Sequence, residues 1–386
     1  MSDMRMPRAM PPLRALPSGG GRTVLGLAGP LAAPVRRPRP QLAAQGLEIE
    51  GPVPIPGEYG PGSAGFRYWA VAEALARGAA LWRAAAEFPW VWAGGGRLRV
   101  QLTGGTDAVC ERGQLRLGAG APLATVMRAL GHAVLDGLRP ALWHVAAQDV
   151  AGFHAGFADA VAMLATLEMS GTADVVPQAT TPFGRAFAEV LVVLAQAGPA
   201  AARRRPDPRL LALRGARLLA DATRRATAAP DFTAQVAAEM ALAATVQEGP
   251  LVALQLRDLF ARHGLLARSP VLEAYDPHLA EDGTELPLPA CSLPWIATDA
   301  ALLGLDLPLL LCPATQPPLV APAADTPAPM AAAHGFAQGL FASGMVERPR
   351  IGRLQRRAPG TNALATHLLL DDGRTLRLVR ERFVAG

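Results

Sequence analysis

The most regular hydrophobic pattern lies between residues 126 and 163 and predicts two packed core helices. The first is marked by apolar residues at helical spacing, namely Leu123, Val126, Met127, Leu130 and Val134. Pro140 closes this segment, because proline cannot continue a helix. The second repeats the spacing with Phe153, Phe157, Val161 and Leu164 and ends at Ser170-Gly171.

The same spacing predicts helices on both sides of this pair. They are expected at 67–88, 183–197, 209–228, 231–247, 251–263 and 331–343. Thr181 and Pro182 are a suitable cap and first residue for the helix at 183–197. Pro89 and Gly264 are expected to end the helices that precede them.

Alternating polar and apolar residues predict a smaller number of strands. Residues 97–103 (RLRVQLT) form one strand, and 114–117 (QLRL) is expected to pair with it as a hairpin. Near the C-terminus, 365–370 and 375–379 flank Asp371-Asp372-Gly373, which is typical of a hairpin turn. A further short strand is expected at 23–27.

These elements indicate an α+β protein in four parts. Residues 1–60 are rich in Arg, Pro and Gly and are expected to be a disordered tail. Residues 61–171 form a small β-hairpin or sheet region packed on the two-helix core, and 172–265 a mostly α-helical domain. Residues 266–386 are Pro-rich, with a short helix and a short C-terminal β-hairpin.

Composition agrees with a globular protein, since 51% of the 386 residues are hydrophobic. All 37 basic residues are arginine, and seven of them lie in the first forty residues with Asp3 as the only acid. Such a tail could bind nucleic acid or an anionic membrane. It has no aromatic residues to stack on bases, so a solvated tail is the simpler interpretation and the nucleic-acid signal is not strong.

The sequence has few features that would mark a disulfide-rich, zinc-ribbon, secreted or membrane protein. Cys110, Cys291 and Cys312 are too few and too scattered for a disulfide framework or a zinc ribbon. No secretory signal and no run of about 18 uncharged apolar residues appears, so we expect no transmembrane segment. The expected location is the cytoplasm.

Three short segments of the predicted helix pair point to a known family: LGHAVLDGLRP at 130–140, FH at 153–154 and FAD at 157–159. They resemble thermolysin-like (gluzincin) zinc metallopeptidases, in particular an uncharacterised bacterial branch of that family. A looser likeness covers most of residues 65–386, including TDAVCER at 106–112 and the closing strand at 375–383. The resemblance implies a metallopeptidase-like core in the region 61–171.

An active site of that family reads His-Glu-x-x-His, with two imidazoles on one zinc ion and a glutamate as general base. Matched by position, the first histidine ligand is Arg128 and the general base is Ala129, while the second ligand survives as His132. The glutamate ligand of the second helix is Ala155, and the aspartate one turn later survives as Asp159. Arginine stays protonated and alanine is neither ligand nor base, so we expect no catalytic residue and no bound metal.

The resemblance also suggests what replaces the metal. In the family, the aspartate lies behind the first histidine ligand. We therefore expect the Arg128 guanidinium to fill the vacated space and pair with Asp159, since a buried charge needs a partner. The alternative is that Arg128 reaches the surface and Asp159 bonds locally.

His132 and His154 are weak candidates for a rebuilt metal site. Neighbouring helix positions point about 100° apart, so His154 is expected to face away from the direction of Ala155. A satisfied core histidine is the simpler interpretation. The oxyanion-stabilising role of the family also lacks a candidate, because residues 170–265 contain only His263 and no tyrosine.

Three functions remain open from the sequence. The first is a catalytically inactive metallopeptidase-like protein (a pseudoenzyme) that binds a protein or peptide partner or serves as a structural component. The second is a zinc-dependent peptidase or hydrolase with a site rebuilt from His132, His154 and Asp159. The third is a protein held on nucleic acid or a membrane by its arginine-rich tail. We expect no cofactor if the first function is right, and zinc if the second is right.

Overall fold

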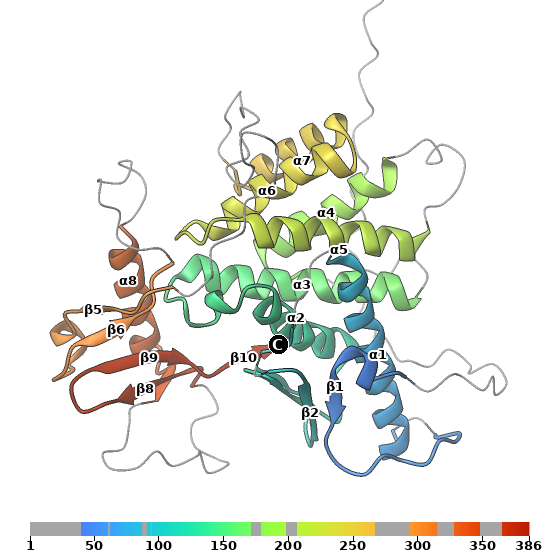
Figure 1. Cartoon of the computed structure of the whole chain (residues 1–386), viewed down its shortest axis with the longest axis horizontal. Helices are drawn as coiled ribbons and strands as arrows, with labels where there is room; N and C mark the ends of the chain where they lie inside the picture. The colour runs from blue at the N-terminus through green and yellow to red at the C-terminus, as the bar shows by residue number, and fades with distance from the viewer. Residues whose placement is uncertain are drawn as a thin grey trace, which may run out of the picture. The chain divides into compact units, whose positions relative to one another are not determined.

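The computed structural model of the protein describes residues 40–60, 62–86, 91–93, 95–170, 179–197, 207–266, 293–314, 328–347 and 365–385. The described residues form an α+β fold with two five-stranded mixed sheets (Figure 1). The helices are α1 (Ala64–Ala85), α2 (Leu123–Leu138), α3 (Gln148–Ser170), α4 (Pro182–Gln196), α5 (Pro208–Arg225), α6 (Phe232–Gln247), α7 (Pro250–Arg262) and α8 (Pro329–Ala342). Short 3₁₀ helices are η1 (Ala43–Gln45), η2 (Pro140–His144) and η3 (Ala301–Leu303).

The centre of the fold is the pair α2 and α3, which the sequence predicts within a few residues at each end. The two helices lie close together at Gly131. A Cβ atom at that position would lie 2.7 Å from the Cα of Ala158, so only glycine permits this packing. The surrounding core is buried and includes Leu130 and Val161.

The first sheet has the order β1-β2-β4-β3-β10. Its strands are β1 (Leu47–Ile49), β2 (Leu98–Thr103), β3 (Ala108–Glu111), β4 (Gln114–Gly118) and β10 (Arg382–Ala385). Strands β1, β2 and β4 are parallel, while β3 is antiparallel to both β4 and β10. The predicted hairpin of β2 with β4 is therefore wrong: the hairpin joins β3 to β4 through Gly113, whose φ is 76°.

The second sheet has the order β5-β6-β9-β8-β7. Its strands are β5 (Ile296–Thr298), β6 (Leu309–Leu311), β7 (Val346–Glu347), β8 (His367–Asp371) and β9 (Leu376–Arg380). The predicted C-terminal hairpin is confirmed as β8 and β9, turning at Gly373 with φ 84°. It forms part of this larger sheet, and leucines of the sheet form a separate small core with alanines of α8.

One segment connects the two sheets. Strand β9 belongs to the second sheet and β10 to the first, and only Glu381 lies between them. Figure 1 shows the chain end close to α2. The last strand therefore ties the second sheet to the helix pair.

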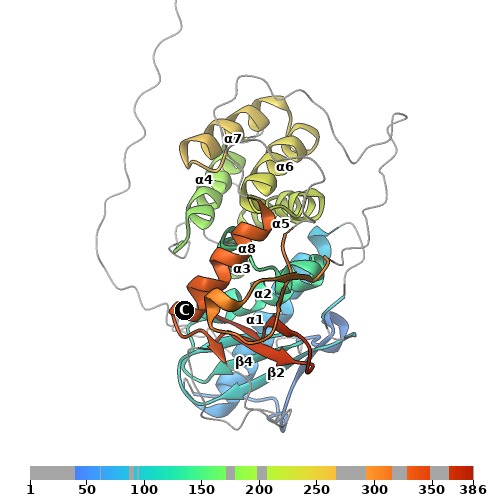
Figure 2. The same ribbon diagram turned by 90° about the vertical axis from the view of Figure 1, so that its left-hand side faces the viewer.

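Helices α4 to α7 form the helical region that the sequence predicts, and Figure 2 shows α4, α6 and α7 grouped together. The Thr181 hydroxyl accepts a hydrogen bond from the Gly184 N–H at 3.0 Å, which confirms the predicted cap of α4. Gly264, with φ 69°, follows the end of α7. A carboxylate of α3 caps α6, since Asp149 Oδ2 accepts from the Thr233 N–H at 2.7 Å.

The sequence missed several short strands. Strand β1 lies within the predicted disordered tail, so that prediction is wrong for Leu47–Ile49. Strands β5, β6 and β10 have only three or four residues each, too few to show alternation. The strand expected at 23–27 and the proline expected to end α1, Pro89, lie outside the described residues.

Helix α3 is also long and apolar enough to cross a bilayer, over Gln148–Met169. Most of that stretch, 83%, is buried inside the protein. Neighbouring helices therefore cover its apolar surface in this fold.

Candidate functional site

Helices α2 and α3 bring most of the predicted site residues into the interior. On α2, Ala129 is fully buried and His132 is 4% exposed. On α3, Asp159 and His154 are each 1% exposed. Ala155 is only half-buried, so it and His154 face different surroundings, as their helical positions predict.

The predicted ion pair between Arg128 and Asp159 is confirmed. Arg128 Nε lies 2.8 Å from Asp159 Oδ1, and the side chains are 14% and 1% exposed. The alternative, in which Arg128 reaches solvent and Asp159 bonds elsewhere, is therefore wrong. A buried guanidinium so close to a carboxylate replaces the hydration that both charges lost on folding.

Asp159 also anchors the segment that leads into α4. Its Oδ2 accepts hydrogen bonds from the backbone N–H groups of Thr180 and Thr181, at 2.9 and 3.1 Å. The hydroxyls of the same two threonines donate to Oδ2 as well, each at 3.0 Å. We call Arg128, Asp159, Thr180 and Thr181 the ion-pair end of the site. Its carboxylate is fully occupied by donors.

One turn further along α2, the site consists of stacked rings instead of an ion pair. The ring of His132 stacks on Phe383 of β10, with centroids 4.4 Å apart and planes at 7°. His154 also stacks on Phe383, at 4.3 Å and 23°. The two histidine rings are 6.0 Å apart. We call His132, His154 and Phe383 the aromatic end of the site.

Strand β9 places an arginine over the aromatic end. The Arg380 guanidinium carbon lies 4.3 Å from the centre of the Phe383 ring, a cation–π contact. The residue is 8% exposed, and burial lowers the pKa of its guanidinium to about 9. The backbone carbonyl of Arg380 accepts from Trp143 Nε1 at 3.1 Å, which attaches β9 to η2.

Four histidines surround this arginine and are held neutral. Burial, with a smaller effect from Arg380, lowers the pKa of His132 to about 3 and that of His367 to about 2. Burial, then Arg112 and Arg380, lowers the pKa of His144 to about 4. The pKa of His154 is also well below its usual value, through burial and then His132 and Arg380. Protonation of any of them in the folded protein is unfavourable.

Asp136 lies one turn beyond His132 on α2 and is 1% exposed. Its nearest cation is Arg112, whose Nε is 3.4 Å from Asp136 Oδ2. Burial raises the pKa of Asp136 to about 6, and Arg112 offsets only part of this effect. This carboxylate is therefore much less well satisfied than Asp159.

The residues present do not fit a zinc ion. Among the described residues no group of three or more His, Cys, Asp or Glu side chains is placed to hold a metal. His132 and His154 are stacked with planes at 26°, whereas ligands of one zinc ion must direct ring nitrogens at a common point. Asp159, the third residue of the rebuilt site, is bonded to Arg128 and the two threonines.

His263, the histidine of the helical region, lies apart from this site. Its Nε2 is 2.9 Å from Glu189 Oε1, which pairs the end of α7 with α4. Residues 1–39, which include the arginine-rich tail, lie outside the described residues.

Sequence reasoning missed the part of the site that β10 supplies. Phe383 lies more than two hundred residues from His154 in the chain, and no local pattern marks it as their neighbour. Arg380 is likewise an ordinary strand residue in the sequence. The one signal is the short apolar run at 383–385, close to the chain end.

Comparisons with known proteins add no further assignment. No protein-family model, no curated protein and no solved structure matches the chain.

Proposed function

We propose that this protein is a catalytically inactive, metallopeptidase-like protein that works by binding a protein or peptide partner or as a structural component. The proposal rests on the ion pair of Arg128 with Asp159. At the position that resembles the first zinc ligand, the chain has a cation that is bound to a fully occupied carboxylate. A cation in this place repels a second cation such as Zn²⁺.

The aromatic end supports the same proposal. Phe383 covers both His132 and His154, and Ala129 provides no carboxylate to accept a proton from water. A hydrolase needs at least an activated nucleophile or water and a base to activate it. No observation favours the hydrolase with a rebuilt site.

Metal analysis of the purified full-length protein tests the proposal. We expect much less than one zinc per chain after exposure to excess zinc and gel filtration, and no cleavage of a casein substrate. Stoichiometric zinc that is lost in His132→Ala would overturn the proposal. The matched control is His263→Ala, which removes a histidine outside the site.

Reconstitution tests the resemblance itself. The triple variant Arg128→His, Ala129→Glu and Ala155→Glu restores the residue types that the family has at these positions. If the scaffold is metallopeptidase-like, this variant binds about one zinc per chain, with the wild-type His132 as second ligand. A folded triple variant that binds no zinc would argue against the resemblance, and adding Phe383→Ala shows whether that ring alone blocks the metal.

A further inference from the structure

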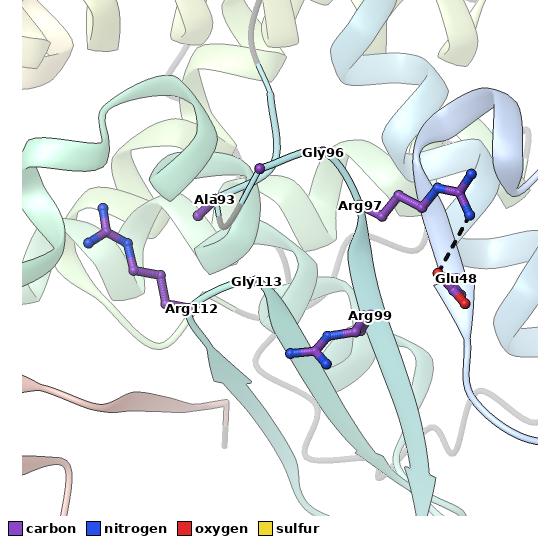
Figure 3. A pocket seen from close by; sticks show the side chains of 8 residues that line it. Glu48, Ala93, Gly96, Arg97, Arg99, Arg112 and Gly113 are labelled. Atoms are coloured by element: carbon purple, nitrogen blue, oxygen red, sulfur yellow. Dashed lines mark ion pairs between the residues drawn. The ribbon is translucent and has the colours of Figure 1, made fainter.

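A surface pocket of about 490 Å³ lies where β1, β2 and the β3–β4 turn come together (Figure 3). Three of its lining residues are arginines, namely Arg97, Arg99 and Arg112, and its one acidic residue is Glu48. We call it the arginine pocket. Its lining carries a net charge of +2, which favours an anionic ligand.

Arg99 is the central cation of the arginine pocket. It is an exposed residue of β2 and has no acidic partner among the described residues. Figure 3 shows its side chain extending from β2 across the space below Gly113. An arginine in this position presents up to five N–H donors in a planar fork, which suits the oxygens of a phosphate.

The other two arginines contact neighbouring groups, but neither has a carboxylate oxygen closer than 3.4 Å. Arg97 Nη1 lies 3.6 Å from Glu48 Oε2, and both side chains are more than half exposed, so this pair contributes little stability. Arg112 is 41% exposed, and its Nε lies 3.4 Å from Asp136 Oδ2. Its Nη2 donates to the Pro140 carbonyl at 3.3 Å, and its Nη1 lies 3.4 Å from His144 Nε2. Neither guanidinium is committed to a short carboxylate pair like that of Arg128.

Glycines leave the rim of the arginine pocket open. Gly95 and Gly96 have φ values of 96° and 139°, which other residues rarely adopt. A Cβ at either position would meet no atom within 4 Å. The sequence therefore keeps side chains out of this loop, and a ligand can approach its backbone directly.

We propose that the arginine pocket binds a phosphate group, either as the free ion or as part of a small phosphorylated molecule. Arg99 supplies the first pair of hydrogen bonds. Arg97 turns from Glu48 toward the bound anion, and Arg112 exchanges its contacts with Pro140 and His144 for contacts with the anion. This site is separate from the ion-pair and aromatic ends, so it does not depend on the proposed function. Arg112 also contacts Asp136 of α2, so the bound phosphate competes with that carboxylate.

Calorimetric titration of inorganic phosphate into the full-length protein at low ionic strength tests this site. We expect a Kd of about 1 mM or tighter, weakened about tenfold in Arg99→Gln and in Arg112→Gln. Arg116→Gln is the matched control, because Arg116 lies on the same sheet but pairs with Glu111 outside the pocket. Glu48→Gln removes the one acid and releases Arg97, so it should bind phosphate several-fold more tightly.

Two results would contradict the proposed phosphate site. Equal losses in Arg99→Gln and Arg116→Gln would indicate diffuse charge and overturn the proposal, as would no heat of binding at about 10 mM phosphate. Phenyl phosphate distinguishes the two sources of the anion. Tighter binding of phenyl phosphate than of phosphate identifies a phosphorylated molecule as the ligand, and equal binding identifies the free ion.

Discussion

The ion-pair end and the aromatic end are both built on α2 and α3, yet opposite kinds of contact stabilise them. At the ion-pair end, Arg128 and the two threonines surround the Asp159 carboxylate with donors. At the aromatic end, His132 and His154 are stacked on Phe383 and are held neutral by burial. One end depends on an ion pair, and the other depends on histidines that carry no charge.

This difference determines how each end responds when its contacts change. A buried charge needs several partners at once, and removing one of them leaves the others unsatisfied. A cluster of neutral rings is stabilised by close van der Waals packing, and it remains stable until its histidines are protonated. The two ends should therefore fail under different conditions, and each can be broken while the other stays intact.

Acid should have the largest effect, and it should act on the buried histidines of the aromatic end and of its surroundings. The pKa values of His132, His144 and His367 are about 3, 4 and 2 in the folded protein, below the usual value of about 6.5 in the unfolded chain. Below about pH 6.5 the unfolded chain binds more protons, so stability falls as the pH falls. Each histidine contributes a loss of about 1.4 kcal/mol per pH unit until its folded pKa is reached. Urea unfolding between about pH 7.5 and 4.5 measures the slope.

Two variants show where this slope comes from. His132→Phe removes one titrating ring from the aromatic end and should reduce the slope by about 1.4 kcal/mol per pH unit. Asp136 contributes to the slope with the opposite sign. Its folded pKa of about 6 exceeds the unfolded value of about 3.9, so its contribution to the free energy of unfolding rises as the pH falls. Asp136→Asn should therefore steepen the acid loss. A flat profile in the wild type would contradict the account of the histidine cluster.

The next largest effect should come from Asp159→Ala at the ion-pair end. This change leaves the Arg128 guanidinium, which is 14% exposed, without its carboxylate and leaves two backbone N–H groups without an acceptor. We expect a loss of about 3–5 kcal/mol in the free energy of unfolding, measured by urea at pH 7.5. The acid slope of the variant should match that of the wild type, because its histidines are intact.

The double variant Arg128→Met with Asp159→Ala is the control for the buried charge. Removing both partners leaves no uncompensated guanidinium, so the double variant should recover part of the loss. If it is no more stable than Asp159→Ala alone, the cost comes from the threonine hydrogen bonds and not from the ion pair.

The sequence predicts the ion-pair end better than the aromatic end, for a physical reason. Arg128 and Asp159 lie on two long helices with clear apolar periodicity, so their relative place follows from helix packing. Phe383 reaches the site on a four-residue strand at the end of the chain. Pairing between β3 and β10 joins segments about 270 residues apart, and no local propensity specifies it.

The same contrast holds for the fold as a whole. Helices α2 to α7 match the predicted ranges closely because each repeats its apolar pattern over several turns. The parallel pairing of β2 with β4 was missed because adjacent alternating segments suggest a simple hairpin. The arginine pocket was missed because its residues lie on separate strands and loops and have no shared motif.

The smallest effect should come from Thr181→Val, which removes one hydroxyl where the ion-pair end meets α4. That hydroxyl donates to Asp159 Oδ2 and accepts from the Gly184 N–H, so it serves the carboxylate and the helix cap together. Valine keeps the shape but loses both hydrogen bonds, and we expect a loss of about 1–2 kcal/mol in urea unfolding. Thr181→Ser keeps the hydroxyl and should lose less than half of this. Equal losses in the two variants would show that the methyl group, and not the hydroxyl, stabilises the junction.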